Sequence, residues 1–113
     1  QFTAAQNHPL PSTINIKIED KVQAAPFTLQ AHNISSRQTH QSEVTWYTQA
    51  WTAGSSSINQ QSPLITNLVR NIVNKENWKS GNPLVFILSG NGLRSATSFD
   101  ASAINSARLY INY

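Results

Sequence analysis

The run Ser62-Pro-Leu-Ile-Thr-Asn-Leu-Val-Arg-Asn-Ile-Val-Asn-Lys-Glu-Asn-Trp78 decides which fold the chain can adopt. Its apolar residues come in adjacent pairs that repeat every four residues: Leu64 and Ile65, Leu68 and Val69, Ile72 and Val73. This spacing draws one stripe along an α-helix, whereas a strand would alternate single apolar residues. Ser62 can cap free backbone N–H groups and Pro63 suits the first helical turn. The pattern therefore predicts a helix over about residues 63–76.

Short alternating segments lie on both sides of this helix. In residues 13–19, Ile14, Ile16 and Ile18 point one way, and the intervening polar residues, Glu19 among them, point the other way. Further strands are predicted at 1–5, 43–48, 84–89, 93–99 and 107–113, with Gly90-Asn91-Gly92 as a hairpin turn between two of them. Short strands with one helix predict an all-β fold, an antiparallel two-sheet sandwich of the jelly-roll kind with a crossover helix.

The composition favours a single domain with a neutral surface. Only 12% of the 113 residues are charged, while 12 Asn, 9 Gln, 14 Ser and 9 Thr supply amides and hydroxyls, as is common in secreted or cell-surface β proteins. The chain has no cysteine, which excludes disulfides, thiolate metal sites and a cysteine nucleophile. Its basic residues are scattered, so nucleic acid is not predicted as a partner. No apolar run reaches the roughly 20 residues that span a bilayer.

Aromatic residues are the best candidates for a binding surface, because sugar rings stack on aromatic faces. Tyr47 and Tyr110 alternate with inward-facing residues and should point outward, so they are predicted ligand residues together with Trp51. A core position is the alternative for Trp51. The residues predicted to form the structural core are Trp46, Trp78, Phe86 and Leu109.

Metal and catalytic chemistry have weak support in the sequence. His8, His32 and His40 match no zinc spacing and are predicted to be solvated loop residues. Glu19, Asp20 and Asp100 are candidates for a calcium site, but five acids in the whole chain are too few for a strong one, so no metal or cofactor is predicted. Adjacent Glu19 and Asp20 would face opposite sides of a strand and cannot form a glycosidase pair. The chain is therefore predicted not to be an enzyme.

Several motifs in the chain resemble one group of proteins. The pattern consists of Val44-Thr45-Trp46, Trp51, Ser62-Pro63-Leu64, Ile72-Val73, Trp78, Ser80-Gly81-Asn82, Ser89-Gly90-Asn91-Gly92-Leu93-Arg94, Ala96, Phe99-Asp100 and Ala107-Arg108-Leu109. It resembles the extracellular β-sandwich modules of bacterial secreted and surface proteins, which include DNRLRE-type domains and related carbohydrate-binding modules. The resemblance extends over residues 1–113 and is most specific between Val44 and Arg94.

The resemblance implies a non-catalytic jelly-roll module of an extracellular or cell-surface protein, either carbohydrate-binding or a spacer. It also implies that Arg37, Arg94 and Arg108 bond to carbonyl groups or an acid rather than to a ligand. Such modules carry further strands before the position of Gln1, so residues 1–113 are expected to lack N-terminal strands. An open sheet edge would then accept a strand from another chain. The alternative function is accordingly a structural subunit of a surface filament or assembly that a partner strand completes. The partner could be a second copy of this chain, which would make a homo-oligomer.

Overall fold

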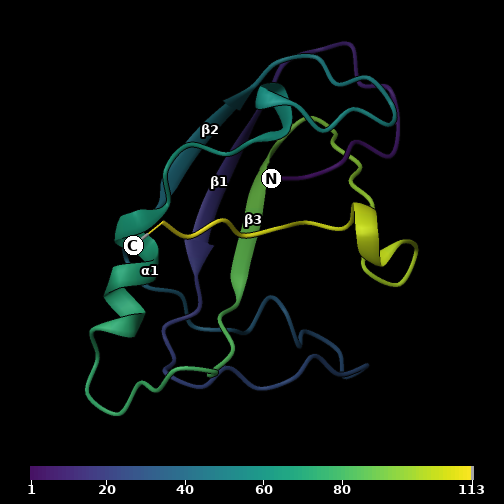
Figure 1. Ribbon diagram of the computed structural model, residues 1–113. Coiled ribbons are helices and arrows are strands. Elements are labelled where there is room, and N and C mark those ends of the chain that lie inside the picture. The colour runs from purple at the N-terminus through teal and green to yellow at the C-terminus, as the bar shows by residue number, and fades with distance from the viewer. Residues whose placement is uncertain (113) are drawn as a thin grey trace. The chain divides into compact units, whose positions relative to one another are not determined.

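The computed structural model describes residues 1–112, and Tyr113 lies outside the described residues. The described part of the chain forms three strands, one α-helix and two short 3-10 helices (Figure 1). In chain order they are β1 (Ser12–Ile18), β2 (Val44–Thr48), η1 (Ile58–Gln60), α1 (Thr66–Val73), β3 (Phe86–Asn91) and η2 (Ala103–Asn105). Strands with a single α-helix agree with the predicted secondary-structure content.

The three strands form one antiparallel sheet in the order β2-β1-β3, so β1 is its central strand (Figure 1). The alternation predicted for β1 is confirmed, because Ile16 and Ile18 are buried. In β2, Trp46 and Thr48 are buried, whereas Tyr47 between them is exposed. α1 lies in the connection between the outer strands β2 and β3, so the predicted crossover helix is confirmed.

The helix is shorter than the apolar stripe predicted. It begins at Thr66 rather than near Pro63, and Ile65 at the N-cap provides no side-chain cap. The Ser62 hydroxyl donates to the carbonyl of Pro63, so this side chain does not cap the helix. Leu64 is 87% exposed, and Leu68 and Ile72 are the helical residues that are buried. The stripe therefore buries one side of about two turns.

The predicted hairpin around Gly90 is wrong. β3 continues through Gly90 to Asn91 and pairs with β1, while residues 93–99 form no strand and contribute one bridge, between Ala96 and Ala4. A Cβ atom on Gly90 would lie 1.9 Å from the carbonyl oxygen of Thr13. Glycine at this position allows the two backbones to approach closely, as the pairing of β3 with β1 requires.

The described chain contains two compact units, each with its own buried residues. Unit 1 comprises residues 1–14, 46–63 and 90–113, and its buried apolar residues are Ala4, Trp46 and Trp51. Unit 2 comprises residues 15–45 and 64–89, and its buried apolar residues are Ile16, Ile18, Ala24, Leu68 and Ile72. Aromatic side chains thus fill the core of unit 1, and aliphatic side chains fill that of unit 2.

The segments predicted as the first and last strands form no regular strand and pair at single positions only. Ala4 bridges Ala96, and Gln1 exchanges backbone hydrogen bonds with Arg108. Beyond Arg108 the described chain has no regular structure, and Leu109 is 45% exposed, which corrects its assignment to the core. The strand predicted over residues 107–113 is wrong for its described part, where residues on both predicted faces are exposed. Of the three other predicted core residues, Trp46 is buried, and Trp78 and Phe86 are half-buried.

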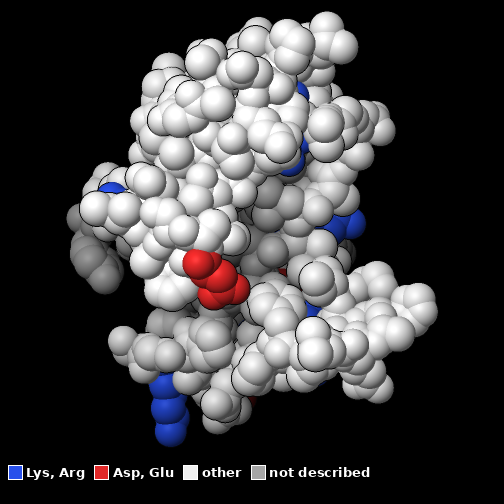
Figure 2. All heavy atoms as spheres, turned by 90° about the vertical axis from the view of Figure 1, so that its right-hand side faces the viewer, with Lys and Arg blue, Asp and Glu red and all other residues white. Residues whose placement is uncertain are grey.

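No helix among the described residues is both long enough and apolar enough to cross a membrane. The surface is largely neutral, and Figure 2 shows a face on which uncharged side chains cover most of the area.

Candidate functional site

Unit 1 carries a pocket of about 360 Å³. Its wall contains one aromatic side chain, one charged side chain, one aliphatic side chain, one glycine and five neutral polar side chains: Gln1, Thr3, Gly54, Ser56, Ile104, Asn105, Ser106, Arg108 and Tyr110. The volume lies at the lower end of the range of small-molecule sites. Amide and hydroxyl groups beside an aromatic ring offer hydrogen bonds and a stacking surface together.

Hydrogen bonds between distant segments build this wall. The backbone nitrogen of Gln1 donates to the carbonyl of Arg108 at 2.8 Å, and the nitrogen of Arg108 donates back at 2.9 Å. This reciprocal exchange is that of a hydrogen-bonded antiparallel pair. The Gln1 side-chain amide also donates to the carbonyl of Ser56, at 3.0 Å, and the Ser56 hydroxyl donates to the carbonyl of Phe2. Segments more than fifty residues apart are thereby held together at the pocket.

Arg108 and Tyr110 lie two residues apart and both line the pocket. The Arg108 guanidinium donates through Nη2 to the carbonyl of Ile104, in η2. Tyr110 is 63% exposed, so its side chain is accessible to a ligand. Burial lowers the pKa of the amino group of Gln1 below its ordinary value. Among the described wall residues there is no Asp or Glu, so Arg108 is the charged side chain of the pocket.

A cluster of three aromatic rings forms the core of the same unit. The rings of Phe2 and Trp46 stack with centroids 6.0 Å apart, and Trp51 lies 5.9 Å from Trp46 and 6.5 Å from Phe2. The Trp51 indole N–H donates to the carbonyl of Asn59 at 2.9 Å. Trp51 is only 3% exposed, which corrects its assignment as a ligand residue. Its ring and its N–H are both engaged inside the protein.

The three predicted ligand residues are therefore not brought together. Tyr110 lines the pocket, Trp51 belongs to the core, and Tyr47 is 75% exposed in β2 without being among the described pocket residues. Sequence reasoning missed Gln1 and Arg108 as wall residues. The predicted alternation of residues 107–113 was the signal for Arg108, because it placed Arg108 on the same face as Tyr110.

Two residues next to the aromatic core connect loops of unit 1. Arg94 donates to the carbonyls of Leu10 and Gln49, each at 2.8 Å, and its guanidinium lies 5.5 Å from the Trp51 ring. Burial lowers the pKa of Arg94. His8 was predicted to be solvated, but it is 6% exposed because its backbone pairs with Trp51 and its Nε2 accepts from the backbone N–H of Ser95.

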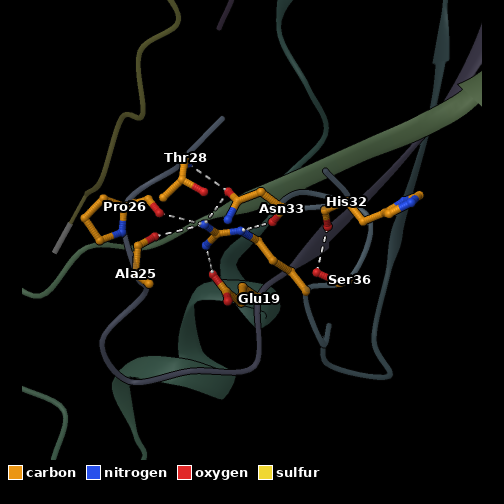
Figure 3. A network of polar contacts seen from close by, with 8 residues as sticks. Glu19, Ala25, Pro26, Thr28, His32, Asn33 and Ser36 are labelled. Carbon is orange, nitrogen blue, oxygen red and sulfur yellow. Dashed lines mark hydrogen bonds and ion pairs between the residues drawn. The ribbon is translucent and has the colours of Figure 1, made fainter. Parts of the chain in front are cut away.

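In unit 2, a second arginine, Arg37, lies at the centre of a network of hydrogen bonds, which we call the Arg37 node (Figure 3). Its Nη1 donates to Glu19 at 2.7 Å, its Nε to the carbonyl of Asn33 at 3.0 Å, and its Nη2 to the carbonyls of Ala25 and Pro26. The guanidinium also lies 4.4 Å from the Phe27 ring. Each nitrogen of this guanidinium donates to a group of the protein, so Arg37 holds the surrounding loop together.

This node corrects the predicted orientation of Glu19, which is 3% exposed rather than solvent-facing. Arg37 neutralises the buried carboxylate, and that pairing allows it to leave water. The other candidate calcium ligand in this segment, Asp20, accepts from Lys75 at 2.6 Å. Arg37, Arg94 and Arg108 each bond carbonyl groups or an acid, as predicted, whereas the part of that prediction which excludes a ligand stays a prediction.

Within residues 1–112, no cluster of three or more His, Cys, Asp or Glu residues could hold a metal ion. Comparison with known proteins adds no assignment: no family model, no curated protein and no solved structure matches the chain. The pocket in unit 1 is therefore the candidate site that the geometry itself supplies.

Proposed function

We propose that this chain is a non-catalytic module that binds a saccharide in the pocket of unit 1. The observation that carries the proposal is the wall of that pocket, where the exposed ring of Tyr110 stands beside neutral amide and hydroxyl groups. Pyranose rings present C–H faces that stack on aromatic rings and hydroxyls that need several neutral hydrogen-bond partners. No carboxylate occurs among the described wall residues, so a carboxylate pair for glycoside hydrolysis has no support there.

The proposal includes the wider setting inferred from sequence. We place the module on an extracellular or bacterial cell-surface protein, as a single domain whose three-stranded sheet is one layer of a two-sheet sandwich of the jelly-roll kind. The antiparallel bridges Ala4–Ala96 and His8–Trp51 support a second layer, because they pair further segments outside the regular strands. The resemblance to DNRLRE-type and carbohydrate-binding modules supports the same setting. Binding of this kind needs no metal or cofactor.

The test compares two exposed tyrosines, one inside the pocket wall and one outside it. Tyr110 and Tyr47 are both largely exposed, at 63% and 75%, but only Tyr110 is among the described pocket residues. Purified protein is screened against a polysaccharide panel by affinity electrophoresis, and binding to the best ligand is measured by calorimetry. We expect Tyr110→Ala to weaken binding about tenfold or more, since one lost stacking and hydrogen-bonding side chain costs roughly 1.4 kcal/mol or more. Tyr47→Ala should bind as the wild type does.

Two outcomes would refute the proposal. One is the absence of binding to every polysaccharide in the panel. The other is binding that Tyr47→Ala abolishes while Tyr110→Ala leaves it intact.

A second function has one specific observation in its favour. β2 and β3 are the outer strands of the sheet, and an outer strand can pair with a strand of another chain. The chain would then be a structural subunit of a surface filament or a homo-oligomer. Electron microscopy and light scattering of purified protein distinguish the two proposals: fibres or discrete oligomers favour assembly, and isolated monomers that bind polysaccharide favour the module.

A further inference from the structure

We infer that the pocket of unit 1 selects acidic saccharides, with Arg108 as the residue that recognises a uronic-acid carboxylate. This inference rests on the proposed saccharide-binding function and names the ligand class of the same site. Its first support is the charge of the pocket. Arg108 is the one charged side chain among the described wall residues, and no acid stands beside it in the wall. An anionic ligand would meet an uncompensated positive charge there.

The second support is the state of the Arg108 guanidinium compared with the two other arginines that bond loops. Arg37 uses all three nitrogens, one of them on a carboxylate. Arg94 uses both terminal nitrogens on carbonyls, and its Nε is buried. Within residues 1–112, the Arg108 side chain has one acceptor, the carbonyl of Ile104, which Nη2 contacts. The guanidinium is therefore anchored at one corner and retains N–H donors.

The third support is that the Arg108 backbone is held in place before any ligand arrives. Its N–H and carbonyl both pair with Gln1, and its side chain is tied to η2. A planar guanidinium presents a fork of donors that matches both oxygens of a carboxylate. Tyr110 in the same wall offers a ring on which the sugar can stack while its carboxylate meets Arg108. One monosaccharide would satisfy both residues.

The experiment compares one saccharide backbone in two charge states. Calorimetry measures binding of an oligogalacturonide and of its methyl ester, in which the carboxylates are masked, to wild type, Arg108→Gln, Arg108→Lys and Arg70→Gln. Arg70 is an exposed arginine of α1 in unit 2 and serves as the matched control for loss of one positive charge. A neutral galactan and its sulfate ester form a further pair. Circular dichroism and thermal melts confirm that each variant is folded.

We expect wild type to bind the acid about 10- to 100-fold more tightly than the ester, the usual effect of a hydrogen bond to a charged group. Arg108→Gln should bring the ratio of acid affinity to ester affinity close to one, Arg108→Lys should keep part of the preference, and Arg70→Gln should keep all of it. Arg108→Lys keeps the positive charge but lacks the paired guanidinium donors, so it separates the effect of charge from that of donor geometry. It also tests the inference if Arg108→Gln does not fold.

Other results overturn the inference in distinguishable ways. Equal binding of acid and ester by the wild type overturns the acidic specificity but leaves the proposed function standing. Binding of neither oligogalacturonide nor galactan in either form overturns the acidic specificity, and the proposed function falls with it only when the whole polysaccharide panel also fails to bind. Equal loss in Arg108→Gln and Arg70→Gln means that net charge, and not the pocket, produces the preference. Tighter binding of the sulfate ester than of the uronate overturns the assignment to a carboxylate.

Discussion

The two units place their charged side chains in contrasting roles. Unit 2 contains all three ion pairs found among the described residues, Lys17–Glu43, Arg37–Glu19 and Lys75–Asp20. Unit 1 has three charged side chains in all, Arg94, Asp100 and Arg108, and none of them takes part in those pairs. Charge in unit 2 therefore stabilises the fold, whereas in unit 1 it stands beside a pocket or bonds carbonyl groups.

The two units also differ in the kinds of residue that they bury. Unit 2 buries aliphatic residues together with one neutralised acid, Glu19, whereas unit 1 buries two tryptophans together with His8, Thr48 and Gln60. The buried polar side chains of unit 1 make hydrogen bonds, as with Thr48, which contacts the hydroxyl of Ser12 at 2.8 Å, and Gln60, which accepts from the backbone N–H of Ser57 at 2.9 Å. A core of large rings and satisfied polar groups explains how unit 1 remains ordered with so few charges.

The largest expected effect tests the role of charge in unit 2. Replacement Arg37→Gln leaves the buried Glu19 carboxylate without its partner, and we expect the free energy of unfolding to fall by about 3–5 kcal/mol. Urea denaturation measures the loss. Glu43→Gln is the control, because the Lys17–Glu43 pair is about two-fifths exposed, and such pairs contribute about 0–1 kcal/mol. Similar losses for the two variants would show that burial does not increase the contribution of the Arg37–Glu19 pair to the free energy of unfolding.

A smaller effect is expected at Gly90 in unit 1. Gly90→Ala introduces a methyl group that meets the carbonyl oxygen of Thr13, so the backbone must shift, at a cost of about 1–3 kcal/mol. Gly81→Ala is the control, since φ at Gly81 is also positive but a Cβ there meets no atom within 4 Å. The control should lose only about 1 kcal/mol, from the left-handed backbone alone. Thermal unfolding compares them, and a Gly90 variant no less stable than the control would contradict the close pairing of β3 with β1.

The smallest effect sharpens the contrast between the two arginines. Arg108→Gln removes one hydrogen bond from an exposed guanidinium, so stability should fall by at most about 1 kcal/mol. The same replacement at Arg37 should cost several times more. Parallel urea titrations of the two variants provide the comparison. A loss at Arg108 as large as that at Arg37 would assign Arg108 a structural role and weaken the case for it as a binding residue.

Local patterns located the helix and three of the six predicted strands but predicted the partners of those strands poorly. The alternation of Ile14, Ile16 and Ile18 located β1, and the paired apolar residues located α1. Asn91 and its flanking glycines suggested a local turn, yet β3 runs through Gly90 because β1 accepts it there. Turn-forming residues indicate which conformation a segment can adopt by itself. Here the backbone groups of β3 pair with the distant strand β1 instead.

The candidate site was predicted only in part, for a related reason. Tyr110 was expected to be an outward-facing ligand residue, and it lines the pocket. Trp51 was also listed as a ligand residue, with the core as the alternative, and it packs in the core against Phe2 and Trp46. Leu109 was expected in the core but is exposed. Which side of a residue is covered depends on segments far away in the chain, and those segments leave no periodic signal near the residue.

The amino-acid sequence by itself determined the periods of the strands and helix, the scarcity of charge and the absence of cysteine, because these follow from neighbouring residues or from composition. Tertiary structure alone decided that β3 joins β1, that Glu19 is buried against Arg37, and that Gln1 meets Arg108 to form the wall of a pocket. Each of those contacts joins residues separated by at least eighteen positions. Their formation depends on closing long loops and on competing partners, which local sequence does not encode.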